Sequence, residues 1–274
     1  MGFKEKLSQE AKINLDKLPT GYQIVGNILL LKLPKIKSQK EKMIVAEKSK
    51  KILPYIKTVC EIKEVSGEFR KAKIKILFGK STETIHKENG ILYKLDVSKI
   101  MFSKGNLSER KRLIGKINPG EIVVDMFAGI GYFSLNLAKF TKTKNIYSIE
   151  KNKTAFGYLK ENIRLNKIKN IEPLYGDCRK VKIKEKADRI IMGYFPGTDK
   201  FLPSAFRLLK KKGIIHYHNI FSKEELWDKP IQILEKSAKE NGFKLERVLE
   251  KKIVKDYAPN VYHVVVDAEF RKLE

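Results

Sequence analysis

Two glycines and two carboxylates stand near the ends of apolar segments, and their spacing suits the binding of a nucleotide cofactor. Asp125 ends one such segment and is followed by Gly129 and Gly131. Glycines there let the backbone pass close to a ligand and turn into a helix, although a lone pair of glycines is often only a tight turn. Glu150 lies 25 positions after Asp125, close to the spacing at which a carboxylate meets a ribose diol. Because the third glycine of the dinucleotide fingerprint is missing, an adenosyl cofactor fits this pattern better than a nicotinamide one.

A third group, Gly176-Asp177-Cys178, follows another apolar segment, where it could meet an adenine ring. The whole arrangement resembles class I S-adenosylmethionine-dependent transferases, and the alternative is an α/β sheet with incidental carboxylates. The resemblance implies that Glu150 holds the ribose and that Asp177 holds the adenine edge. The other cofactor contacts that it implies in this region are Phe127, Gly129, Gly131 and Cys178.

Two further regions support a narrower resemblance. One comprises residues 82–90 and 101–112, and the other, residues 255–267, reads Lys-Asp-Tyr-Ala-Pro-Asn-Val-Tyr-His-Val-Val-Val-Asp. Over about residues 73–270 the sequence resembles the archaeal and eukaryotic family that modifies the guanosine just downstream of the tRNA anticodon. One branch of that family methylates the guanine ring nitrogen. The other branch synthesises wybutosine by moving the aminocarboxypropyl group of S-adenosylmethionine onto a tricyclic wyosine precursor.

The segment after Ala187–Met192 discriminates between the two branches. The methylating branch has an Asn-x-Pro-[Lys/Tyr] motif there, whereas this sequence reads Met192-Gly193-Tyr194 and has no Asn. It is similar to the aminocarboxypropyl branch, and it also looks too short for the extra amino-terminal tRNA-binding domain of the archaeal methylating enzymes. The resemblance therefore implies aminocarboxypropyl transfer to demethylwyosine in the anticodon region of tRNA(Phe). The alternatives are a tRNA guanine N1-methyltransferase and a non-catalytic RNA-binding protein.

Four more residues match site positions of the family. Ser103 and Arg110 match positions near the amino acid part of the cofactor, and a guanidinium suits a bidentate carboxylate contact. Ser103 could equally cap the helix that follows, and Arg110 could contact phosphate or form a surface ion pair. Tyr194 and Phe195 could stack on a flipped base or could simply pack the loop.

Metal and redox chemistry find no support in the sequence. The four histidines show no metal-ligand spacing and are more often packed or hydrogen-bonded residues than bases; they are His86, His216, His218 and His263. Cys60 and Cys178 are too far apart for a metal or redox motif, so reduced thiols are the simplest interpretation. We therefore expect no metal, and the sequence identifies no catalytic base.

The elements that must position these residues form two regions. We predict a small amino-terminal α+β region over 1–105, with a break near 55, and a Rossmann-like domain over 106–274. In the first region Tyr22–Leu31 is strand-like and Ser38–Lys51 is helical. In the second, strands alternate with helices, which predicts an α/β fold with a mainly parallel sheet covered on both faces.

Several element boundaries can be predicted in the second region. The expected strands are Ile122–Phe127, Asn145–Glu150, Ala187–Met192 and Gly213–Tyr217. A capping box over Ser222–Glu225 predicts a helix around Trp227. The last two apolar runs, Lys244–Val254 and Val261–Phe270, suit an antiparallel hairpin that ends the sheet.

The charge of the chain indicates a polyanionic partner. The 274 residues carry 58 Lys and Arg against 32 Asp and Glu, a formal net charge of +26. Both predicted regions share the excess, since the first 105 residues hold 23 basic and 11 acidic residues and the rest hold 35 and 21. A distributed excess favours nucleic acid, although it could also serve solubility and thermostability. Apolar runs are too short to cross a bilayer, and we expect a cytoplasmic monomer.

Overall fold

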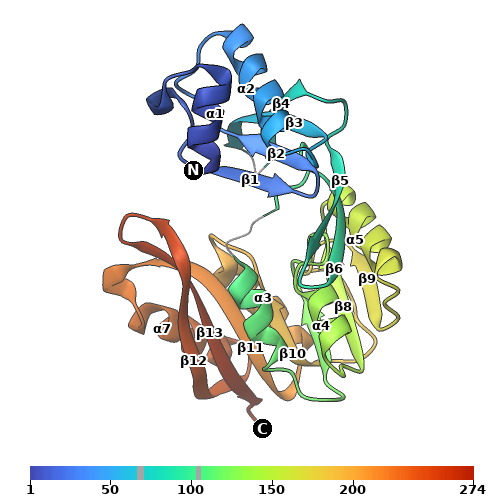
Figure 1. The fold of residues 1–274 in the computed structure, drawn as a ribbon. Coiled ribbons are helices and arrows are strands. Elements are labelled where there is room, and N and C mark those ends of the chain that lie inside the picture. Colours follow the sequence, from blue (N-terminus) through green and yellow to red (C-terminus); the bar gives the residue numbers. More distant parts are fainter. Residues whose placement is uncertain (67–70, 103–105) are drawn as a thin grey trace. The chain divides into compact units, whose positions relative to one another are not determined.

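The computed structural model describes all residues except 67–70 and 103–105 (Figure 1). Contacts between Cα atoms divide the chain into two compact units, Met1–Phe102 and Ser103–Glu274. We describe each unit by itself. No helix in the described part of the chain is both long enough and apolar enough to cross a membrane.

The first unit contains a four-stranded sheet in the order β1-β2-β3-β4, packed against two helices. Strands β2 and β3 are parallel, and the crossover between them contains α2. Leu7, Leu29, Val45 and Val59 are fully or almost fully buried in the core between these layers. The elements are α1 (Phe3–Ala11), η1 (Leu15–Lys17), β1 (Tyr22–Val25), β2 (Ile28–Leu31), α2 (Gln39–Ile52), β3 (Thr58–Ser66), β4 (Lys71–Phe78), and a separate hairpin of β5 (Glu83–Glu88) and β6 (Ile91–Asp96).

The segment Tyr22–Leu31, expected to be strand-like, consists of two strands that form a hairpin. Strands β1 and β2 pair antiparallel around a turn at Gly26 and Asn27. Gly26 has a φ of +56°, and a Cβ there would lie 2.1 Å from Oγ1 of Thr84. A glycine is therefore required both by the turn and by the close approach of β5. Helix α2 agrees with the predicted helical segment Ser38–Lys51, and Oγ of Ser38 caps it by accepting a hydrogen bond from the N–H of Glu41.

The second unit is a seven-stranded sheet in the order β12-β13-β11-β10-β7-β8-β9. Strands β11, β10, β7, β8 and β9 are mutually parallel, whereas β13 runs antiparallel to both β11 and β12. This arrangement confirms the predicted α/β class and the predicted terminal hairpin. The elements are α3 (Leu107–Ile114), β7 (Ile122–Asp125), α4 (Ser134–Phe140), β8 (Asn145–Glu150), α5 (Lys153–Leu165), β9 (Ile171–Tyr175), β10 (Ala187–Met192), η3 (Thr198–Phe201), α6 (Leu202–Leu208), β11 (Leu209–Ser222), η4 (Lys223–Glu225), α7 (Asp228–Glu240), β12 (Phe243–Ala258) and β13 (Val261–Lys272).

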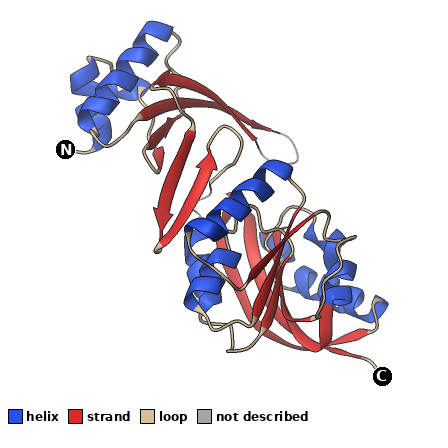
Figure 2. Ribbon diagram, turned by 90° about the vertical axis from the view of Figure 1, so that its right-hand side faces the viewer, coloured by secondary structure: helices blue, strands red, loops and turns tan. Residues whose placement is uncertain are grey.

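Helices cover both faces of this sheet (Figure 2). Alternate strand residues, such as Val124 and Val266, pack into one cluster with apolar residues of α6 and α7. Residues of the opposite parity face the helices on the other side of the sheet: Oγ of Ser148 donates to Oγ of Ser134 at the start of α4, and Asp267 accepts from Arg112 on α3. The capping box at Ser222 and Glu225 is present, but it opens the short η4, and α7 begins only at Asp228.

Candidate active site

The carboxyl ends of β7, β8, β9 and β10 lie at one edge of the sheet because these strands are parallel. In open α/β sheets this edge is where ligands bind. Asp125, Glu150 and Met192 end three of these strands, and Asp177 follows the fourth. The segments that carry the predicted cofactor contacts therefore lie at one edge of the sheet.

The loop after β7 turns sharply through two glycines. Gly129 has a φ of +58° and Gly131 a φ of +98°, both in the left-handed region that favours glycine. A Cβ on Gly129 would lie 2.8 Å from the ring of Tyr132, and one on Gly131 would lie 2.6 Å from Leu135. The glycines therefore let the loop pack tightly against the start of the next helix.

Glu150 and the glycine loop come together as their spacing suggests. The N–H of Gly129 donates to Oε2 of Glu150 at 2.8 Å, and the N–H of Asn152 donates to Oε1 at 2.6 Å. Burial raises the pKa of Glu150, while these donors oppose the rise. The carboxylate is thus fixed beside the loop, where it can accept further hydrogen bonds but has a restricted orientation.

Asp125 has a structural place beneath this loop. Its carboxylate is fully buried and accepts hydrogen bonds from Oγ of Ser134 at 2.7 Å and from the N–H of Phe127 at 3.3 Å. Burial raises its pKa to about 6. It therefore ties the end of β7 to the first turn of α4.

Asp177 and Cys178 differ in their surroundings although they are adjacent. Asp177 accepts two hydrogen bonds from the Arg179 guanidinium, and this partner lowers its pKa to about 2. The Cys178 thiol is buried in the hydrophobic core, which raises its pKa to about 12, and its carbonyl accepts a hydrogen bond from Arg207. The cysteine is free, as predicted, and so is Cys60.

Tyr194 and Phe195 are directed into two different aromatic groups. The Tyr194 ring stacks on Phe127 with centroids 5.0 Å apart, and Phe201 packs edge-on against both rings. The Phe195 ring instead stacks on His263, with centroids 3.9 Å apart. The two rings therefore do not form one platform.

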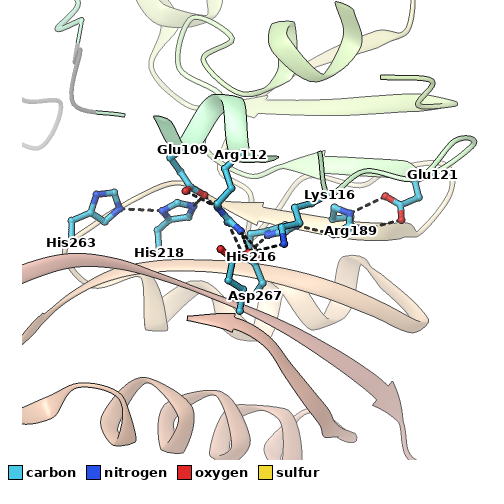
Figure 3. A network of polar contacts seen from close by, with 10 residues as sticks. Glu109, Arg112, Lys116, Glu121, Arg189, His216, His218, His263 and Asp267 are labelled. Carbon is cyan, nitrogen blue, oxygen red and sulfur yellow. Dashed lines mark hydrogen bonds and ion pairs between the residues drawn. The ribbon is translucent and has the colours of Figure 1, made fainter. Parts of the chain in front are cut away.

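Helix α3 carries Arg110, which is only 2% exposed and lies over the Tyr132 ring at 5.9 Å. Its neighbour Arg112 fixes the helix to the sheet (Figure 3). The Arg112 guanidinium donates to Glu109 on the same helix, to Asp267 on β13 at 2.6 Å and to Glu250 on β12 at 2.7 Å. Ser103, the other position predicted for the amino acid part of the cofactor, lies outside the described residues.

The network continues through the sheet. Oδ1 of Asp267 lies 2.6 Å from Nδ1 of His216, whose Nε2 is 3.0 Å from the Arg189 guanidinium, and Arg189 in turn pairs with Glu121. The partners hold the pKa of Asp267 well below its usual range. Sequence reasoning missed Arg112 and Asp267, although both end segments that carry the family resemblance.

A pair of buried imidazoles flanks this network. Nδ1 of His218 lies 3.1 Å from Nε2 of His263, and Nε2 of His218 lies 3.8 Å from Oε1 of Glu109. Burial lowers the pKa of His218 to about 3 and that of His263 to about 2, so both rings are neutral near pH 7. Across the ranges 1–66, 71–102 and 106–274, no cluster of side chains could hold a metal ion.

The sheet, the glycine turn after β7 and the carboxylate at the end of β8 define the fold of class I S-adenosylmethionine-dependent transferases. Residues 84–246 match the sequence family described as the TRM5/TYW2 methyltransferase domain, and residues 3–82 match the TYW2 N-terminal domain. The chain therefore belongs to the TRM5/TYW2 family, and the resemblance found in the sequence is confirmed.

Three relatives place the chain within that family. It is 48% identical to the tRNA(Phe) (4-demethylwyosine(37)-C(7)) aminocarboxypropyltransferase of Methanocaldococcus jannaschii, over 92% of this chain and 98% of that one. It is 36% identical to the tRNA (guanine(37)-N(1))-methyltransferase Trm5b of Pyrococcus abyssi, over 91% of this chain and 74% of that one. Among solved structures, TYW2 of Pyrococcus horikoshii in complex with MeSAdo superimposes with a TM-score of 0.85 at 37% identity and covers 98% of this chain and 99% of its own.

Proposed function

We propose that this chain transfers the aminocarboxypropyl group of S-adenosylmethionine to C7 of 4-demethylwyosine at position 37 of tRNA(Phe), and releases methylthioadenosine. The observation that carries the proposal is the segment at the end of β10, which reads Met192-Gly193-Tyr194 and lacks the Asn of the methylating branch. The 48% identity to an aminocarboxypropyltransferase of nearly the same length supports it.

The residues at the sheet edge fit an adenosyl group. We assign the ribose hydroxyls to Glu150, because its carboxylate is fixed by two backbone N–H groups and can still accept hydrogen bonds. Gly129 and Gly131 would let the backbone approach the cofactor, and Asp177 would accept from the adenine edge. Cys178 would contribute through its backbone, since its side chain lies in the core.

One positively charged side chain, Arg110, and one hydroxyl side chain, Ser103, would hold the amino acid part of the cofactor. Arg110 offers a guanidinium that suits a carboxylate, and Ser103 precedes the same helix. S-adenosylmethionine supplies a sulfonium with three carbon substituents, each open to displacement. The side chains that orient its methionine arm therefore decide which carbon faces the nucleophile.

Tyr194 and Phe195 would serve different parts of the substrate complex. Tyr194 packs with Phe127, a proposed cofactor contact, and so lies on the cofactor side of the loop. Phe195 faces the β12–β13 hairpin and would meet the RNA. Every described residue proposed for the cofactor comes from the second unit. The proposal includes that the chain acts as a monomer, in the cytoplasm, on the anticodon region of tRNA.

The test is a double-label transfer assay. The purified protein is incubated with tRNA(Phe) bearing 4-demethylwyosine and with S-adenosylmethionine labelled separately on the methyl and carboxyl carbons. Carboxyl label alone in the RNA, with methylthioadenosine as the small product, is the expected result. Methyl label with S-adenosylhomocysteine would establish the methyltransferase alternative instead. If no label entered the RNA, the result would favour a binding protein.

A further inference from the structure

A second aromatic group lies beside the proposed cofactor site, where the β12–β13 hairpin approaches the segment after β10. Phe195 stacks on His263 and meets the Tyr257 ring edge-on, with centroids 6.1 Å apart. Nζ of Lys255 lies 5.9 Å from the centroid of the Phe195 ring. An imidazole, an aromatic ring and a cation from the β12–β13 hairpin thus gather around the Phe195 ring, which lies about sixty residues earlier in the sequence.

Strand register explains why these side chains share a face. Lys255 pairs with His263 after a shift between Ile253 and Lys255, so the alternation of β12 changes at this point. His263 has the same parity as Asp267, which faces α3. The shift therefore turns Lys255 toward the face of the sheet that carries α3 and the carboxyl-end loops.

The group combines a buried, fixed side chain with an exposed aromatic ring. His263 is 1% exposed and held by His218, so the ring beneath Phe195 has little freedom. Tyr257, in contrast, is 43% exposed, and residues 258–260 that follow it at the end of β12 and in the turn are also exposed. An exposed aromatic ring beside a lysine is the combination on which unpaired nucleotides stack while their phosphates are neutralised.

We propose that Phe195, Tyr257 and Lys255 form a stacking site for an unpaired nucleotide next to the modified base, with His263 as its support. The inference rests on the proposed function only in taking tRNA as the partner. The target base must lie beside the cofactor, on the side of the loop where Tyr194 packs against Phe127. Phe195 instead packs with His263 and Tyr257, so we assign it to the neighbouring nucleotide and not to the target base.

The experiment measures equilibrium binding of a fluorescent anticodon stem-loop RNA, without modified bases, by anisotropy. Tyr257→Ala is expected to weaken binding at least about fivefold, the lower end for loss of one stacked base. Tyr257→Phe keeps the ring and should bind as the wild type does. Tyr55→Ala removes another exposed tyrosine, in the first unit, and is the matched surface control.

Two further measurements separate stacking from general attraction. Lys255→Met should weaken binding and reduce the slope of log Kd against log salt by about one. A blunt RNA duplex of equal length should bind Tyr257→Ala and the wild type equally, because its bases are not available for stacking. Thermal unfolding of each variant establishes that it is folded.

Unchanged stem-loop affinity in Tyr257→Ala would overturn the proposal, and so would an equal loss of affinity for the duplex. A loss in Tyr257→Phe as large as in Tyr257→Ala would also overturn it, since the ring would then not be the cause. Failure of the label-transfer assay would instead contradict the proposed function alone, because the binding assay requires neither S-adenosylmethionine nor the modified base.

Discussion

At the scale of single residues, Glu150 is the most direct test of the proposed cofactor site. Glu150→Ala removes a carboxylate fixed by two backbone N–H groups. We expect affinity for S-adenosylmethionine to fall about 10- to 100-fold, the range for a hydrogen bond to a charged group. Isothermal titration measures it, with the exposed Glu235→Ala as the control. Equal affinity of the two variants for S-adenosylmethionine would show that Glu150 does not bind the ribose.

Arg112 tests whether the buried network stabilises the second unit. Its guanidinium neutralises Glu109 and Asp267, which are 0% and 2% exposed, as well as the partly buried Glu250. Arg112→Met leaves these carboxylates without their shared cation, so the free energy of unfolding should fall by about 3–5 kcal/mol. Urea denaturation measures it. Arg247→Met breaks an ion pair whose arginine side chain is 66% exposed, and should cost at most about 1 kcal/mol. Similar costs for the two variants would contradict the prediction.

The buried histidines make stability depend on pH. The folded-state pKa values of His218 and His263, about 3 and about 2, lie below the ordinary value of 6.5, and the pKa of His216 is also lowered. Below pH 6.5 the unfolded chain binds protons that the folded rings exclude. Stability is therefore present above pH 6.5 and is lost as the pH falls, by roughly 1 kcal/mol per pH unit for each of His218 and His263, and His216 contributes in the same direction.

Buried carboxylates oppose this trend. The pKa of Asp125 is raised to about 6, and that of Glu150 is raised as well, so the folded state holds protons there that the unfolded chain lacks. Three histidines outweigh two carboxylates, and the free energy of unfolding should fall between pH 7 and about pH 5. Urea denaturation across this range checks the prediction. Asp125→Asn should make the fall steeper, and a flat profile in the wild type would contradict the assignment of neutral rings.

At the scale of elements, the turn from β7 into α4 depends on glycine. Gly131→Ala places a Cβ 2.6 Å from Leu135 and 3.1 Å from Leu159, at a φ of +98°. We expect a loss of about 1–3 kcal/mol in the free energy of unfolding. Gly157→Ala is the matched control, because a Cβ in this helical position meets nothing within 4 Å and should stabilise α5 by about 0.5–1 kcal/mol. Stabilisation by both substitutions would show that the turn tolerates a side chain.

The same elements show what the sequence could and could not predict. The strand Asn145–Glu150 and the approach of Glu150 to the glycine loop were predictable because one strand–helix–strand unit fixes both. Strand β5 escaped prediction because Glu83–Glu88 contains a single aliphatic residue, Ile85. The pairing of Arg112 with Asp267 spans 155 positions and depends on the register of β13, which local pattern does not encode. The divergence of Tyr194 and Phe195 likewise appears only once their partners are placed.

At the scale of the whole molecule, the net charge of +26 should make free and RNA-bound protein respond to salt in opposite directions. Repulsion among the excess cations destabilises the free chain, and the Debye length falls from about 14 Å at 0.05 M to about 4 Å at 0.5 M salt. The Tm of the free protein should therefore rise over this range. Buried pairs such as Arg112 with Asp267 are screened little and should not reverse the rise.

Binding of tRNA contributes to the Tm a stabilisation that decreases as the salt concentration rises. RNA neutralises the same cations and stabilises the folded state in proportion to its affinity, and that affinity falls steeply with salt as counterions compete. The increase in Tm that saturating tRNA produces at about 0.05 M salt should therefore shrink or vanish at about 0.5 M. Differential scanning fluorimetry with and without tRNA measures both effects. A Tm increase that persists at high salt would mean that stacking and shape, rather than charge, dominate the interaction.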